Sequence, residues 1–178
     1  MKKTVLVYGL IAGIICGGTL AISGALNSGS LNFENGMYFG FASMILAAII
    51  MWVGMAAYKK NLGGSISFGK AVGAGILMAL IASSMYVFTW MAMYRTAFAG
   101  FGEKYAAYAI ESLKKSGKSE AEVAEKEKEI RENMERYDSN AVYRLGVTYM
   151  EILPLQIVIV LIAGAVLSRK KGNRTATA

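Results

Sequence analysis

Four long apolar stretches constrain what this 178-residue chain can fold into. They cover residues 4–26, 37–58, 71–94 and 142–168. A helix of about 20 apolar residues crosses the hydrocarbon core of a bilayer, and each stretch is at least that long. Because backbone polar groups in lipid must be satisfied within the segment, each stretch is expected to be a helix. The sequence therefore predicts an all-α, polytopic membrane protein: one membrane domain over residues 1–178, with four transmembrane helices and a helical insertion at residues 95–141.

The first stretch has a second interpretation as a cleaved signal peptide. Lys2 and Lys3 precede it, and the small residues of "ISGA" near its end are typical of a cleavage site. The apolar region of a signal peptide has about 7–15 residues, fewer than this stretch, so we favour a retained span. A lipoprotein signal at Cys16 is disfavoured because Ile15 stands where a small residue is expected.

The distribution of basic residues predicts the orientation in the membrane. Nine of them flank the spans without an acidic neighbour: Lys2, Lys3, Lys59, Lys60, Lys70, Arg169, Lys170, Lys171 and Arg174. The opposite loop, residues 27–36, contains Glu34 and no basic residue, and the insertion mixes both signs. Loops rich in lysine and arginine stay cytoplasmic. We therefore expect both termini in the cytoplasm and the insertion on the extracytoplasmic side.

The segment "GSISFGKA", residues 64–71, matches all but one position of the phosphate-binding pattern G-x-x-x-x-G-K-[ST]. Ala71 stands where the pattern requires a hydroxyl that holds Mg²⁺. Such a loop follows a β-strand, whereas the second predicted span precedes this one. We therefore expect no nucleotide here, and interpret the glycines as a turn, Ser65 or Ser67 as a helix N-cap, and Lys70 as a base that reaches toward the headgroups.

Two segments carry a resemblance to a known family. They are "NGMYFGFASMILA", which leads into the second span, and "GGSISFGKAVGAGILMALIASSMYVFTW", which opens and fills the third. With its four spans, basic loop and long charged insertion, the chain resembles a bacterial membrane-protein family catalogued as domain of unknown function 4199, or DUF4199. The resemblance implies a four-helix integral membrane protein of the bacterial envelope, and it implies no activity, ligand or catalytic residue.

The composition disfavours catalysis. The chain has no histidine, which is the commonest acid–base group and metal ligand in proteins. Its single cysteine excludes an intrachain disulfide. No catalytic constellation emerges from the remaining residues, so we expect neither an enzyme nor a site for a cofactor or metal.

A polar patch in the spans is the first candidate site. Glu151 lies within the fourth apolar stretch, and ionisable residues at membrane depth are functional candidates. Its expected partners are Arg144, seven residues earlier on roughly the same helix face, and Arg95 at the end of the third span. We favour a structural role for Glu151, in an ion pair or a headgroup hydrogen bond near the outer interface, over transport of an ion or small solute. Further residues that we expect to line a small polar cavity with Glu151 are Pro154, Gln156, Ser83, Ser84 and Thr89.

A row of small residues in the first span is a candidate packing face. Gly9, Gly13 and Gly17 recur at four-residue spacing, which lets membrane helices approach closely. We favour packing against another span of the same chain over packing against a second copy.

The insertion at residues 95–141 reads as two helices in a hairpin. The first, residues 97–115, carries an aromatic stripe, and "KKSGKS" separates it from the second. The second opens at "SEAE", which has the spacing of a capping box, and continues to Tyr137. Favourable i,i+4 charge pairs are expected at Glu122–Lys126, Glu127–Arg131 and Glu132–Arg136. The candidate contact stripe of this helix is Val123, Ile130, Met134 and Tyr137.

These observations favour a non-enzymatic integral protein of the bacterial inner (plasma) membrane. We expect its extracytoplasmic hairpin to act in assembly or protein–protein contact. The expected partners are the lipid bilayer and either an envelope protein or a second copy of this chain, with no nucleic acid. The alternative function is a small-solute or ion transport component that uses the patch around Glu151.

Overall fold

A computed structural model describes residues 2–26 and 33–169, with only the backbone of residues 33–35 and 37. The described residues form six α-helices, in agreement with the predicted all-α class. Four are long and apolar enough to cross a membrane: α1 Lys2–Leu26, α2 Phe33–Asn61, α3 Phe68–Met93 and α6 Ala141–Ser168. The four predicted spans are therefore confirmed, and the protein is a multi-pass membrane protein.

The helix ends differ by a few residues from the predicted ones. Helix α2 begins at Phe33, inside the predicted loop at residues 27–36, and continues to Asn61, three residues past the predicted end. Polar residues at a helix end lower the hydropathy without breaking the helix. A span predicted from apolar residues alone is therefore shorter than the helix that contains it. The remainder of that loop, residues 27–32, and the tail, residues 170–178, lie outside the described residues.

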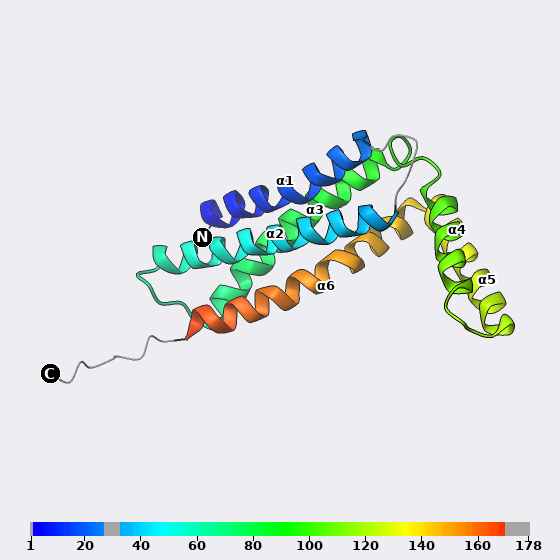
Figure 1. Ribbon diagram of the computed structural model, residues 1–178. Helices are drawn as coiled ribbons and strands as arrows, with labels where there is room; N and C mark the ends of the chain where they lie inside the picture. The colour runs from blue at the N-terminus through cyan, green and yellow to red at the C-terminus, as the bar shows by residue number, and fades with distance from the viewer. Residues whose placement is uncertain (1, 27–32, 170–178) are drawn as a thin grey trace.

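The four long helices lie side by side in one bundle (Figure 1). The first residues of α1, the loop between α2 and α3, and the last residues of α6 meet at one end, which we call the basic end. The remaining two helices, α4 Phe101–Lys114 and α5 Glu120–Ser139, leave from the opposite end, which we call the hairpin end. In the described ranges, every acidic residue other than Glu34 of α2 and Glu151 of α6 belongs to the α4–α5 segment.

Small residues let the four helices approach closely. A Cβ added to Gly54 of α2 would lie 2.6 Å from the Cβ of Tyr8, and one added to Gly75 of α3 would lie 2.6 Å from a methyl group of Val160. Alanine and methionine fill much of the space between the helices, including Ala12, Ala47, Met51, Met55, Met78 and Ala79. The bundle is thus held by close van der Waals packing. Such packing drives helix association in a bilayer, where the hydrophobic effect does not favour contact between helices.

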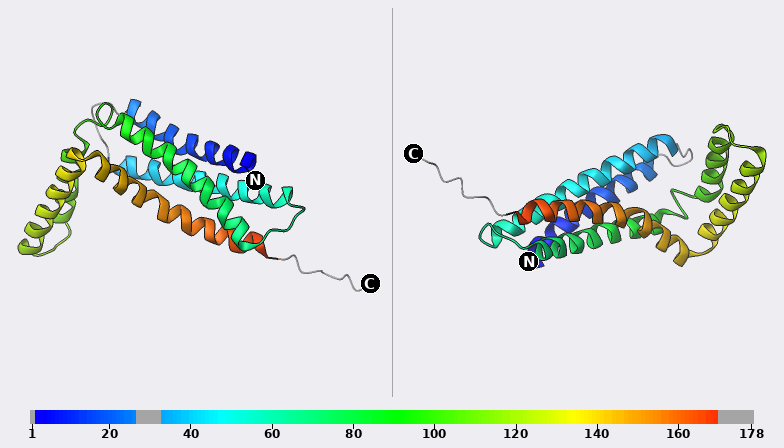
Figure 2. Two further views of the ribbon diagram at one scale, coloured as in Figure 1. Left: turned by 180° about the vertical axis from the view of Figure 1, so that it is seen from behind. Right: turned by 90° about the horizontal axis from the view of Figure 1, so that it is seen from below.

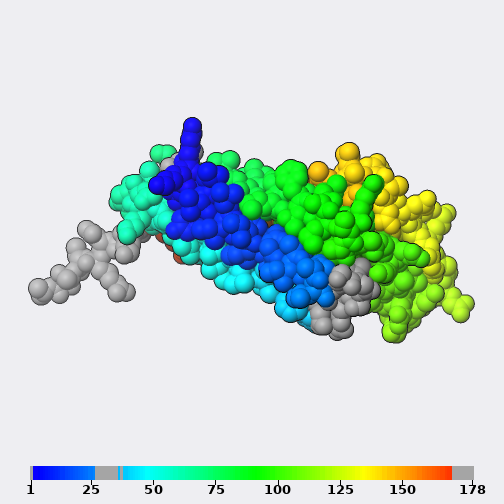
Figure 3. All heavy atoms as spheres, turned by 90° about the horizontal axis from the view of Figure 1, so that it is seen from above, coloured from blue at the N-terminus to red at the C-terminus, as the bar shows by residue number. Residues whose placement is uncertain are grey.

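The proposed glycine face of α1 packs on α3. Gly9, Gly13 and Gly17 are buried, and the residues nearest to their added Cβ atoms are Ile81, Met85 and Thr89. Figure 3 shows α1, in blue, lying directly against the green atoms of α3 on one face of the molecule. These glycines therefore serve contact between two spans of one chain.

The outer surface of the bundle is apolar, as a lipid-facing surface requires. Exposed residues that are large and hydrophobic occur on all four spans, including Ile14 on α1, Ile45 on α2, Phe88 on α3 and Ile162 on α6. Only a minority of each span is buried within the bundle.

Helices α4 and α5 form the predicted hairpin, which projects sideways from the end of the bundle (Figure 2). The first helix begins at Phe101 rather than at residue 97, because a turn continues through Gly100, whose φ is +73°. The predicted capping box is confirmed, since the side chain of Ser119 accepts from Glu122 N and the Glu122 carboxylate accepts from Ser119 N.

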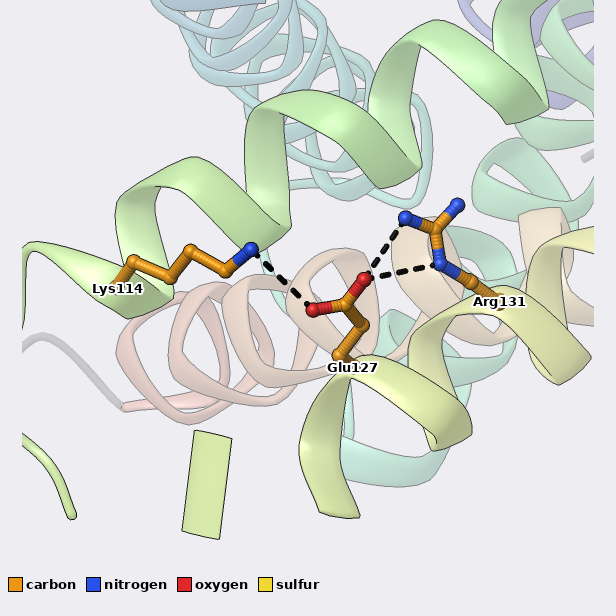
Figure 4. A network of polar contacts seen from close by, with 3 residues as sticks. All are labelled: Lys114, Glu127 and Arg131. Carbon is orange, nitrogen blue, oxygen red and sulfur yellow. Dashed lines mark hydrogen bonds and ion pairs between the residues drawn. The ribbon is translucent and has the colours of Figure 1, made fainter. Parts of the chain in front are cut away.

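One of the three predicted i,i+4 pairs forms in the hairpin. Glu127 pairs with Arg131 at 2.8 Å and with Lys114 of α4 at 3.4 Å, so it also links the two helices (Figure 4). The prediction for Lys126 is wrong, because Glu122 is occupied by the capping box and Lys126 pairs with Glu129 at 2.6 Å. The predicted pair of Glu132 with Arg136 does not form in the described hairpin. Arg136 contacts the ring of Tyr143, with its guanidinium carbon 4.5 Å from the ring centroid.

Candidate functional site

The hairpin is fixed to the bundle by a buried cluster that we call the junction. Its aromatic and polar side chains come from α3 and the residue after it, from the end of α5 and from the start of α6. Its members are Trp90, Tyr94, Tyr137, Asp138, Arg144 and Thr148. All except Asp138 are less than a tenth exposed. The order of the chain explains the meeting, because α3 ends and α6 begins at the same end of the bundle.

Arg144 is the buried cation of the junction. Its side chain is 3% exposed, and Nη1 donates to the backbone oxygens of Tyr137 at 2.6 Å and Asp138 at 3.2 Å. Its guanidinium carbon lies 4.0 Å from the ring centroid of Tyr94, within the range of a cation–π interaction. Arg144 thus satisfies the carbonyls at the end of α5 and connects that end to α6. Its Nε is buried without a hydrogen-bond partner in the described part of the chain.

Three side chains form a directed chain of hydrogen bonds beside Arg144. Trp90 Nε1 donates to the Tyr137 hydroxyl at 2.8 Å, and that hydroxyl lies 3.1 Å from Thr148 Oγ1. Because Thr148 donates its single hydrogen to the backbone oxygen of Arg144 at 2.8 Å, Tyr137 is the donor to Thr148. Burial raises the pKa of Tyr137, which keeps the hydroxyl protonated and able to donate.

Tyr94 and Asp138 close the outer side of the junction. The Tyr94 hydroxyl donates to Asp138 Oδ1, and burial together with this hydrogen bond raises the pKa of Tyr94. The Asp138 carboxyl lies over Gly102 of α4, where an added Cβ would come within 2.6 Å of its carbon. Asp138 therefore requires a residue without a side chain at position 102.

An aromatic layer surrounds these polar groups. The Trp90 ring centroid lies 4.9 Å from those of Phe98 and Phe101 and 5.5 Å from that of Tyr94. Aromatic pairs at such separations contribute about 0.5–1.5 kcal/mol each beyond the area they bury. The junction is therefore a second core, separate from the alanine and methionine core between the spans.

The predicted polar patch is brought together only in part. Ser83 Oγ donates to Gln156 Oε1 at 3.0 Å in the bundle interior, and the Nε2 of Gln156 is buried with no partner among the described residues. Ser84 accepts at 2.8 Å from the hydroxyl of Tyr149, and Thr89 donates to the backbone oxygen of Met85 at 2.9 Å.

Glu151 is exposed on α6 and forms no hydrogen bond with these groups within the described residues. Arg144, expected as its partner, is turned toward the hairpin, because the free carbonyls at the end of α5 and the Tyr94 ring hold its guanidinium. Arg95 and Pro154 are also exposed. Within the described residues Glu151 makes no ion pair, and α6 continues unbroken through Pro154.

The contact stripe of α5 faces the inside of the hairpin. Val123, Ile130 and Met134 are half-buried and Tyr137 is buried, whereas most other residues of α5 are exposed. Helix α4 is the principal neighbour of α5, and Met134 packs on the aromatic layer of the junction. The free surface of α5 is therefore its charged side.

Sequence reasoning placed Arg144 and Tyr137 in other roles and did not single out Trp90, Tyr94 or Thr148. A signal was present in the spacing of Trp90, Tyr94, Phe98 and Phe101, aromatic residues three or four apart that continue past the end of the third span.

Comparison with known proteins gives one finding. A family model described as "Protein of unknown function (DUF4199)" matches residues 7–169 of the chain. No curated protein and no solved structure matches it.

Proposed function

The chain belongs to the DUF4199 family of proteins of unknown function, and we propose that it is a non-enzymatic bacterial inner-membrane protein whose hairpin binds another envelope protein. The basic residues of the basic end support a cytoplasmic location for that end and for both termini. The hairpin end is then extracytoplasmic, where the charged side of α5 is available to a partner.

The observation that carries this proposal is the buried junction. Connections between neighbouring helices of a bundle take about 2–8 residues, whereas residues 94–140 separate α3 from α6. A long insertion that is folded and fixed by a buried arginine is expected where a surface must be presented in a constant position. Long segments between elements of a compact domain are commonly functional for this reason.

The charge of α5 indicates the chemistry of the partner. This helix carries eight acidic and four basic side chains. Glu125 and Glu132 are exposed, seven residues apart, on the side opposite the half-buried stripe. We therefore propose a partner with a basic surface, and an association that weakens as salt concentration rises.

Photocrosslinking in living cells tests this function. A photoreactive residue at exposed Ala121 is expected to capture one discrete envelope protein, and the double variant Glu125→Lys/Glu132→Lys is expected to abolish that product. The same photoreactive residue at Leu62, exposed at the basic end, is the control position and should not capture it. A product that survives charge reversal, or that appears equally from Leu62, would contradict the proposal.

A second candidate function is transport of an ion or small solute past Glu151. The Nε2 of Gln156, which is buried beside Ser83 without a partner in the described part of the chain, favours it. Burying such a group costs free energy, so its presence calls for an explanation, and a polar path for a solute is one. In proteoliposomes Glu151→Gln is then expected to abolish flux, and Glu103→Gln on α4 is the matched control. Equal flux in both variants would exclude this function.

A further inference from the structure

A cavity of about 1100 Å³ opens at the basic end of the bundle. It lies between the last turn of α2, the loop from α2 to α3, the first turn of α3 and the last residues of α6. Its polar lining consists mainly of Lys59, Lys60, Ser65, Ser67, Lys70 and Arg169. Binding pockets for small molecules occupy about 300–1000 Å³, so the space suits a group larger than a single ion.

The cavity is strongly electropositive. Four of its lining residues are cationic, and none is acidic. Lys59 is held by a hydrogen bond of 2.6 Å from Nζ to the backbone oxygen of Leu167, so its charge is fixed at the cavity wall. Lys60, Lys70 and Arg169 are exposed, and within the described residues none of them takes part in an ion pair.

The start of α3 adds to this potential. Ser67 is the N-cap residue, yet its hydroxyl makes no capping hydrogen bond. The first backbone bond into this turn is from Ala71 N to Ser67 O at 3.0 Å. The backbone N–H groups of residues 68–70 have no partner within the helix, and they lie with the positive end of the helix dipole at the basic end of the bundle, where the lysines of the cavity also lie.

We propose that this cavity binds the phosphate group of an anionic lipid headgroup. The cavity lies where three membrane spans end, which is the depth of the headgroups. Basic pockets between spans are suited to anionic headgroups, and lysine and arginine are the usual partners of phosphate. The segment Gly64–Lys70 thus supplies lysine, serine and a helix start to a phosphate, as nucleotide-binding loops do, but from between two membrane helices.

Native mass spectrometry of the full-length protein in neutral detergent tests this site. We expect phosphatidylglycerol to bind at least tenfold more tightly than phosphatidylcholine with the same acyl chains. A lysine near an anionic surface contributes about fivefold, so Lys60→Gln/Lys70→Gln is expected to weaken phosphatidylglycerol binding about 10- to 30-fold. Lys60→Arg/Lys70→Arg keeps both charges and should bind as the unaltered protein does, which separates loss of the site from loss of the fold.

The matched control is Lys2→Gln/Lys3→Gln, which removes two exposed lysines from the same end but outside the cavity. It should change the affinity less than threefold. Equal losses in the two glutamine variants would overturn the site in favour of diffuse surface charge, and equal binding of the two lipids would overturn it as well. Displacement of the lipid by glycerol 3-phosphate at micromolar concentration would retain phosphate recognition and overturn the lipid as its source.

Discussion

Removal of one oxygen atom from the junction tests whether the junction holds the hairpin. In Tyr137→Phe the ring remains, while Trp90 Nε1 loses the acceptor at 2.8 Å. Thr148 keeps its bond to the backbone oxygen of Arg144, so the indole N–H is the principal group left unpaired. A buried donor without a partner costs about 1–3 kcal/mol, and we expect the free energy of hairpin opening to fall by that amount.

Hydrogen exchange followed by mass spectrometry measures this free energy at the amides of α5. Each 1.4 kcal/mol is a factor of ten in an equilibrium constant, so exchange by local opening should accelerate about 5- to 150-fold. The amides of residues 2–13 in α1 should be unaffected, because this half of the helix begins at the basic end, whereas Leu20 near its other end packs on the aromatic layer of the junction.

Tyr143→Phe is the matched control for this experiment. It removes the same atom from a residue near the junction, where the hydroxyl donates to Asn133 Oδ1 at 3.4 Å in an exposed position. Exchange in this variant should change less than about twofold, since exposed hydrogen bonds contribute little beyond those to water. Equal acceleration in Tyr137→Phe and Tyr143→Phe, or none in either, would refute the structural role assigned to the junction.

Three further predictions concern packing, capping and pH. Gly54→Ala should lower the melting temperature in detergent, because overpacking against Tyr8 costs about 1–3 kcal/mol, whereas Gly73→Ala, which meets open space, should not lower it. Ser119→Ala should lower the stability of the first turn of α5 by about 1 kcal/mol, measured by hydrogen exchange, with Ser116→Ala as the control. The pKa of Tyr94 is raised in the fold, so its contribution to stability is present below about pH 10 and is lost as pH rises above that value. The near-ultraviolet circular dichroism of the junction should then decline above pH 10, and less so in Tyr94→Phe.

The spans and the hairpin could be predicted because their signals are local. The apolar stretches, the capping box at Ser119 and the break before it depend on residues that are close in sequence. Helix ends were less accurate where polar residues such as Lys60 and Asn61 continue a helix beyond its apolar part.

The junction could not be predicted because it depends on which elements meet. Arg144 and Glu151 share a helix face by spacing, and this made them the expected pair. The structure offers Arg144 a nearer set of partners, the carbonyls of Tyr137 and Asp138 and the ring of Tyr94, which sequence spacing alone does not bring together. Likewise, Lys59, Lys60 and Lys70 indicated orientation, but their convergence on a cavity requires the end of α6.

The junction also has a consequence for synthesis of the protein. Trp90 and Tyr94 are synthesised well before Arg144 and Thr148. The junction is therefore incomplete, and the hairpin is not yet fixed to the bundle, while the last span is still being synthesised and inserted. The contacts from Trp90 to Tyr137 and from Tyr94 to Arg144 join residues far apart in the sequence, so they form only when α6 has taken its place beside α3. An open hairpin therefore marks an unfinished chain, and membrane proteases that recognise loose segments have a physical basis for distinguishing it from a mature one.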